Sequence, residues 1–144
     1  MSRALVQFGL SYAISDMIKN IQNTHATIKI TYKQNINNKR FDSEIEKGLY
    51  RVLQELLSNI VKHAEATTAE IELVKNSNVL NVKIKDNGVG LVHNILEGKQ
   101  SLGIGLKNVE TRINYLSGSF IINESVKKGT EILIAIPTNK LLNA

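Results

Sequence analysis

The sequence contains no cysteine, no tryptophan and only one proline among its 144 residues. Without cysteine the chain forms neither a disulfide nor a metal site built on thiolates, and three scattered histidines do not indicate a structural zinc site. No apolar run approaches the roughly 18 residues that a membrane-spanning helix needs, and no signal-peptide pattern opens the chain. We therefore expect a cytoplasmic domain that makes no direct membrane contact, although its parent protein can still be membrane-anchored.

The chain is basic, but its positive charge is dispersed. The formal net charge is +5, yet no run of five or more basic residues occurs, and only three phenylalanines and four tyrosines are present to interleave with basic side chains. Nucleic-acid binding usually needs a concentrated basic surface, so we expect no nucleic-acid partner. Apolar residues make up 42% and charged residues 22%, which is ordinary for a folded domain, and the length suits one domain over residues 1–144.

The spacing of apolar residues predicts the secondary structure. Helices are expected over residues 5–24, over residues 42–64 with Asp42 as the N-cap, and from about Gly105 to Gly118. Strands are expected at residues 25–33, 69–75, 79–86, 119–124 and 130–136. This order predicts an α+β fold, a two-layer α/β sandwich in which about three helices cover one face of a mixed sheet of about five strands.

A row of polar residues lies on the second predicted helix. Glu55, Asn59 and His63 are four residues apart, so they rise along one side, with Asn59 and His63 near the edge of the apolar stripe and Glu55 just outside it. An asparagine amide oxygen suits a Mg²⁺ ion that phosphates already hold, and a glutamate there can act as a general base or hold a metal-bound water. A solvated helix flank is the alternative interpretation.

A second polar group, Asp86 to Gly90, follows a strand. Asp86 is in phase with the aliphatic Leu80, Val82 and Ile84, and a carboxylate aimed at the buried side is costly unless it is paired. It can accept a hydrogen bond from an exocyclic amine, while the two glycines of the run let the backbone close on a planar ring. The alternative is an ordinary Asp-Asn-Gly turn that caps the strand.

The third group is Gly103-Ile104-Gly105-Leu106, which opens the last predicted helix. Paired glycines at a helix N-terminus present free N–H groups and the positive end of the helix dipole, an arrangement that suits a phosphate. Taken alone, the pair is weak evidence, because a flexible helix start gives the same pattern.

The order of these groups resembles the Bergerat ATP-binding fold. A helix with Glu-x-x-x-Asn, a strand ending Asp-x-Gly-x-Gly, a helix opened by Gly-x-Gly-Leu and a strand that begins with Gly129-Thr130 cover the chain from about Phe8 to Pro137. Within that superfamily the run Asn59–Ala64 is similar to the N box of sensor histidine kinases. The run Leu106–Arg112, the short loop between the glycine boxes and the segment Phe8–Leu10 are typical of the nitrate-sensor-like subfamily.

The resemblance implies roles for individual residues. Asp86 would bond the adenine amino group, Asn59 would hold Mg²⁺, and Glu55 would be the catalytic acidic residue. Thr130, in phase with three isoleucines of its strand, would face the adenine. The remaining residues implied in nucleotide binding, near the phosphates, the adenine or the lid, are Lys62, His63, Gly88, Gly90, Gly103, Gly105 and Leu106.

By the same resemblance, the chain would bind ATP and Mg²⁺ and transfer the γ-phosphoryl group to a histidine. None of His25, His63 and His93 lies on a predicted helix ahead of an acidic residue, as an acceptor histidine should. The expected partners are therefore a separate dimerisation and phosphoacceptor domain of the parent kinase and a downstream response regulator. The phenylalanine-bearing box of many histidine kinases is absent from residues 91–102, as expected for a short lid.

Two other functions stay open at this point. One is another enzyme of the same fold, such as an anti-sigma-factor-type serine kinase or the ATPase half of a DNA-handling machine. The other is a non-catalytic module that binds nucleotide, or only a partner, as a regulator. The joint presence of Glu55, Asn59, Asp86 and the glycines favours catalysis over the regulatory module.

Overall fold

The computed structural model describes residues 2–90, 104–123 and 129–138. The helices are α1 (Arg3–Phe8), α2 (Leu10–Thr24), α3 (Ser43–His63) and α5 (Ile104–Tyr115). The strands are β1 (Lys29–Gln34), β2 (Thr68–Asn76), β3 (Val79–Asp86), β4 (Ser119–Asn123) and β5 (Thr130–Pro137). Among these residues no helix is both long and apolar enough to cross a membrane.

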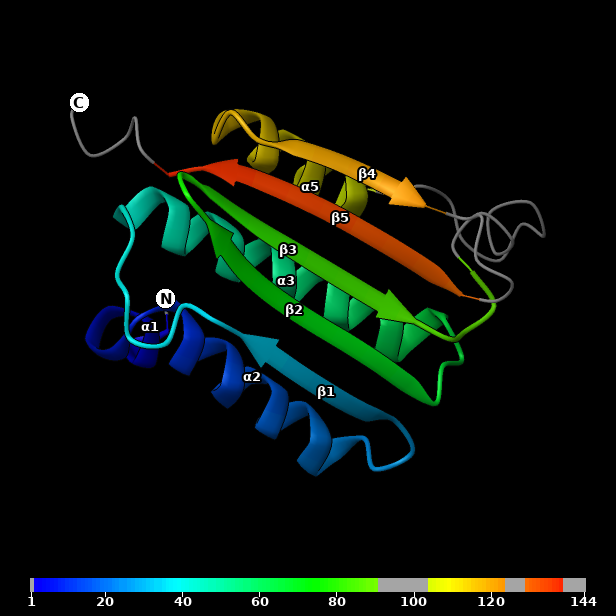
Figure 1. Cartoon of the computed structure of the whole chain (residues 1–144). Coiled ribbons are helices and arrows are strands. Elements are labelled where there is room, and N and C mark those ends of the chain that lie inside the picture. The colour runs from blue at the N-terminus through cyan, green and yellow to red at the C-terminus, as the bar shows by residue number, and fades with distance from the viewer. Residues whose placement is uncertain (1, 91–103, 124–128, 139–144) are drawn as a thin grey trace.

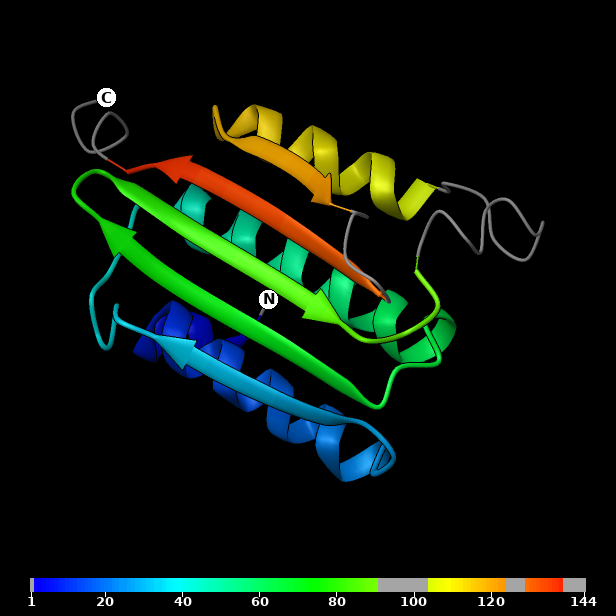
Figure 2. The same cartoon turned by 45° about the vertical axis from the view of Figure 1, so that its right-hand side comes forward.

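The strands form one mixed sheet in the order β1-β2-β3-β5-β4. β1 runs parallel to β2, and the β2–β3, β3–β5 and β4–β5 pairs are antiparallel. The described helices lie on the same face of this sheet, with α3 behind its middle, α2 beside β1 and α5 beside β4 (Figures 1 and 2). The predicted α+β class and two-layer sandwich are confirmed.

Alternation along the strands places the core between the two layers. Leu80, Val82 and Ile84 of β3 are each at most 2% exposed, and they face an apolar stripe of α3 that includes Leu53 and Leu57. The N-cap of α3 is Asp42 as predicted, because its side chain accepts a hydrogen bond from the Glu44 N–H at 2.8 Å.

The single helix predicted over residues 5–24 is wrong, because Gly9 divides it into α1 and α2. Gly9 has φ +92°, a conformation that side-chain-bearing residues rarely adopt, and its N–H donates to the Leu5 carbonyl to end α1. Phe8, which was counted on the apolar stripe, is 53% exposed. The chain turns here because Arg40 occupies the space beside Gly9, with its Cδ 2.9 Å from where a β-carbon would lie.

The next strand also begins later than its alternating pattern indicates. His25 is the C-cap of α2 rather than the start of a strand, and its N–H donates to the Ile21 carbonyl at 2.8 Å. β1 begins at Lys29. The side chain of Gln22 accounts for this start, since it accepts from the Ile30 N–H and donates to the Ile28 carbonyl.

A partly buried ion pair joins the start of α3 to α1, with a buried Glu46 and an Arg40 side chain that is 47% exposed. Glu46 is 4% exposed, and its carboxylate accepts hydrogen bonds from Arg40 at 3.0 Å and from the Phe41 N–H at 3.0 Å. The same guanidinium donates to the carbonyls of Leu5 and Val6. The pair therefore holds α1 against the base of α3.

Replacement of Arg40 by alanine is expected to lower the free energy of unfolding by about 1–3 kcal/mol, because it leaves the buried Glu46 carboxylate without its charged partner. Urea denaturation followed by circular dichroism measures this loss. The matched control is Lys39→Ala, at an exposed neighbour, which should change stability by less than about 0.5 kcal/mol. Equal effects of the two substitutions would contradict the structural importance of the ion pair.

Candidate functional site

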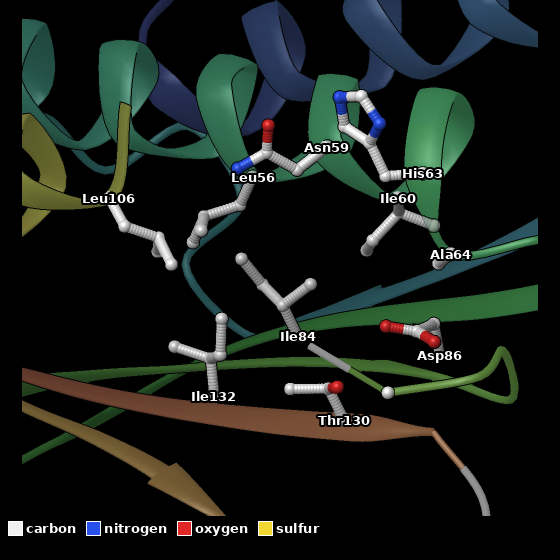
Figure 3. Close-up of a pocket in the computed structure, with 11 residues that line it drawn as sticks. Leu56, Asn59, Ile60, His63, Ala64, Ile84, Asp86, Leu106, Thr130 and Ile132 are labelled. Atoms are coloured by element: carbon white, nitrogen blue, oxygen red, sulfur yellow. The ribbon is translucent and has the colours of Figure 1, made fainter. Parts of the chain in front are cut away.

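A cavity of about 460 Å³, open to solvent, lies between α3, the start of α5 and the sheet (Figure 3). The lining is mainly apolar and comes from five parts of the chain: Leu56, Asn59, Ile60, His63, Ala64, Ile84, Asp86, Gly90, Leu106, Thr130 and Ile132.

The polar end of the cavity is built by two neighbouring strands. Asp86 on β3 and Thr130 on β5 are register partners in the antiparallel ladder, and each is 6% exposed. Ile84 and Ile132 form the next inward-facing pair and continue the wall with apolar surface. The sheet thus presents a carboxylate and a hydroxyl side by side at the edge of a hydrophobic slot.

The position of Asp86 is compatible with both interpretations that its sequence context left open. One carboxylate oxygen accepts a hydrogen bond from the Gly88 N–H at 2.8 Å, as in a turn that caps a strand. The same side chain lines the cavity, where Figure 3 shows it across from α3. A carboxylate has about four lone-pair directions, so a turn cap and a contact to a ligand are compatible.

Two glycines near the site allow backbone segments to approach one another closely. A β-carbon on Gly88 would lie 2.0 Å from the Ala64 carbonyl oxygen, and one on Gly129 (φ +98°) would lie 1.9 Å from the Asp86 carbonyl oxygen. Gly88 therefore lets the turn after β3 pack on the end of α3 and is not itself among the residues lining the cavity. Gly90, with φ +89°, does line it.

The polar row on α3 divides between two hollows. Asn59 and His63 line the cavity, with Asn59 half-buried and His63 exposed. Glu55 lies outside it, in a groove between α3 and α5. Lys62 is exposed and does not line the cavity either.

The start of α5 closes the cavity beside α3. Leu106 is 6% exposed and lines the cavity, whereas Gly105 touches the side chain of Glu55. A β-carbon on Gly105 would lie 2.6 Å from a carboxylate oxygen of Glu55, so the absence of a side chain there leaves room for that carboxylate. Gly103 and His93 lie outside the described residues.

The apolar half of the lining was not predicted as part of the site. Leu56, Ile60 and Ile84 carry the same helix and strand periodicities as the core residues next to them. The one available signal was their position beside a motif residue, such as Ile84 two positions before Asp86. In the described ranges no three His, Cys, Asp or Glu side chains gather as a metal site, so Asn59 would hold an ion only together with oxygens of a ligand.

The family of this chain is shown by a match that covers most of its length. Residues 44–140 match the family described as histidine kinase-, DNA gyrase B- and HSP90-like ATPase, which is most of the chain. The chain belongs to that family, and the superfamily resemblance seen in the sequence is confirmed.

Two relatives narrow the comparison to sensor kinases. The chain is 30% identical over 134 residues to the oxygen sensor histidine kinase NreB of Staphylococcus carnosus, covering 93% of this chain and 38% of that protein. It is 31% identical over 134 residues to the histidine-protein kinase/phosphatase DegS of Brevibacillus brevis, covering 93% of this chain and 34% of that protein. The chain thus spans less than two fifths of either relative, and the similarity to NreB agrees with the nitrate-sensor-like subfamily.

Solved structures agree on the fold. The Acinetobacter baumannii histidine kinase AdeS superposes with a TM-score of 0.72 at 20% identity, over 90% of this chain and 65% of that one. The Erythrobacter litoralis blue-light activated histidine kinase superposes with a TM-score of 0.73 at 18% identity, over 91% of this chain and 45% of that one.

Replacement of Gly88 by alanine is expected to cost about 3 kcal/mol of stability, because the new methyl group collides with the backbone of Ala64. Gly105→Ala is the matched control, since its methyl group meets only the end of the flexible Glu55 side chain and should cost less than about 1 kcal/mol. Thermal and urea unfolding of both variants measure the difference. A stable Gly88→Ala protein would show that the turn after β3 does not need this close approach.

Proposed function

We propose that this cavity binds MgATP and that the chain, as a cytoplasmic domain, transfers the γ-phosphoryl group to a histidine on a separate dimerisation and phosphoacceptor domain, upstream of a response regulator. The observation that carries the proposal is the pairing of Asp86 and Thr130 at the end of an apolar slot, with Asn59 on the helix opposite. An adenine ring needs a flat apolar space with hydrogen-bonding groups at one end, and phosphates need cations and amides at the other.

The adenine would lie between the sheet and α3. Its exocyclic amine would donate to the carboxylate of Asp86, while Ile84 and Ile132 on one side and Ile60 on the other would cover its faces. Thr130 can donate to or accept from a ring nitrogen. Gly90 leaves the rim of the slot without a side chain, so the ring can enter next to the backbone.

The phosphates would point from the slot along α3. Asn59 would hold Mg²⁺ through its amide oxygen, together with phosphate oxygens, and the bound ion would neutralise the charge of the transferred group. His63 and Lys62 would add donors near the phosphates, and the N-terminus of α5, at Gly105 and Leu106 with Gly103 ahead of it, would supply backbone N–H groups.

In the transfer step an imidazole nitrogen of the acceptor histidine would form a bond to the γ-phosphorus as the bond to the bridging oxygen of ADP breaks. Glu55 would accept a proton from, or orient, that imidazole. Its place outside the nucleotide cavity means that the imidazole would arrive from the groove between α3 and α5. Catalysis would then consist mainly of positioning and charge neutralisation.

The histidine acceptor is favoured over serine by the relatives. Two proteins named as histidine kinases are 30% and 31% identical to this chain over 134 aligned residues, which is nearly the whole of this chain. The serine kinase and the non-catalytic nucleotide-binding module remain the alternatives that the experiments below distinguish.

The nucleotide half of the proposal is tested with Asp86→Asn. The asparagine oxygen can still accept from the Gly88 N–H, so the turn is preserved while the carboxylate charge is lost. We expect wild-type protein to bind a non-hydrolysable ATP analogue with Mg²⁺ and to prefer it over the GTP analogue, and the variant to bind it about tenfold to a hundredfold more weakly. Isothermal titration calorimetry with both analogues measures this. No binding by the wild type at millimolar nucleotide would refute the ATP site.

The transfer half is tested by adding the separately expressed dimerisation and phosphoacceptor domain of the parent kinase. With radiolabelled ATP the isolated chain should not label itself, whereas the added domain should acquire acid-labile, base-stable label, slowly because the covalent linkage is absent. Asn59→Ala should abolish the transfer by removing the metal ligand, while Gln54→Ala on the same helix should retain nucleotide affinity. Acid-stable label on serine would favour the serine kinase.

A further inference from the structure

Two adjoining hollows lie along the solvent side of α3, apart from the proposed nucleotide cavity, and are together called the groove. Its inner part lies between α3 and α5, and its outer part lies between α3 and the start of α1, at Ser2, Lys47 and Tyr50. The two parts share Arg51 and Gln54. From Lys47 to Ser58 the groove follows α3 for about 16 Å, the length of about three helical turns. The polar residues that line the inner part, beside Val109, are Arg51, Gln54, Glu55, Ser58, Asn108 and Arg112.

The groove is positively charged apart from one carboxylate. Lys47, Arg51 and Arg112 are exposed in or along it, against the half-buried Glu55. Neither arginine makes an ion pair in the described ranges, where ion pairs join Arg40 to Glu46 and Lys83 to Glu72. Two solvent-exposed guanidinium groups that line one hollow are suited to carboxylates, which they can bind in bidentate fashion.

The groove meets the nucleotide cavity at Glu55. That residue is one turn before Asn59, which lines the cavity, and its carboxylate lies against Gly105, the neighbour of Leu106 in the cavity wall. A chain bound in the groove therefore passes Glu55 before any of its side chains can reach the phosphate end of the cavity. The groove is the approach from which an acceptor side chain meets Glu55 first.

The geometry points to this groove as the docking surface for an acidic segment of the phosphoacceptor domain, with Arg51 and Arg112 binding its carboxylates on either side of Glu55. The inference rests on the proposed phosphoryl transfer and adds the partner's recognition chemistry. Charge complementarity of this kind fixes register and speeds association more than it strengthens a single contact. It would set the acceptor imidazole at Glu55 rather than elsewhere along α3.

The test reverses the charge of the groove with the double substitution Arg51→Glu and Arg112→Glu. We expect the KM for the added phosphoacceptor domain to rise at least about tenfold at low salt, with kcat at saturating acceptor largely kept and nucleotide affinity unchanged. Added NaCl should raise the KM of the wild-type protein for the phosphoacceptor domain, whereas it should not raise the KM of the double variant appreciably. The matched control, Lys19→Glu with Lys29→Glu, changes the net charge equally at exposed sites on α2 and β1 and should leave KM within about twofold of the wild-type value.

The outcomes separate this inference from the proposed function. An unchanged KM, or an equal rise in the control, overturns the groove assignment while leaving the kinase function intact. Absence of nucleotide binding by wild-type protein in calorimetry overturns the proposed function instead. Direct binding of the phosphoacceptor domain, measured with a non-hydrolysable ATP analogue present, needs no transfer, and equal affinity for wild type and groove variant would again contradict the inference.

Discussion

The site depends on one backbone contact, where the turn after β3 packs on the end of α3. The Val89 N–H donates to the Ala64 carbonyl at 2.8 Å, and the absence of a side chain at Gly88 allows that approach. Asn87 secures the same turn, since its side-chain oxygen accepts from the N–H groups of Thr67 and Thr68. Because the Val89–Ala64 hydrogen bond is made by backbone atoms, it fixes the distance between helix and strand independently of how the lining side chains rotate.

This contact determines which side chains face one another. With the end of α3 held at the end of β3, Asn59 and His63 lie across the cavity from Asp86 (Figure 3). The antiparallel register then brings Thr130 beside Asp86, and Gly129 lets the start of β5 approach the Asp86 carbonyl. Segments far apart in the sequence thus meet at one polar end of the cavity, where Asp86 and Thr130 are each 6% exposed.

Much of this arrangement can be predicted from the sequence because periodicity reports burial. The alternation that ends at Asp86 gave β3 its correct bounds, and Asp42 marked the start of α3. Periodicity does not show where a helix changes direction. Leu5 and Phe8 continue the helical spacing of α2, and for this reason the break at Gly9 was not predicted. Nor does periodicity report which neighbour a helix face will meet. The position of Glu55 depends on where α5 packs, and its carboxylate lies where a side chain at position 105 would otherwise be.

The separation of Glu55 from the nucleotide cavity has a consequence for the proposed reaction. A general base that faced the phosphates from inside the cavity would also activate water there, and bound ATP would be lost to hydrolysis. Here the carboxylate lies in the neighbouring groove, one helical turn from Asn59, so it would meet bound phosphates only at the boundary between the two hollows. In the proposed complex, an acceptor that filled the groove would exclude water from that boundary and complete the site at the same time. The proposed dependence on a partner domain would thus follow from the packing of α5, which holds the Glu55 carboxylate outside the cavity. The acceptor domain would then be part of the catalytic geometry.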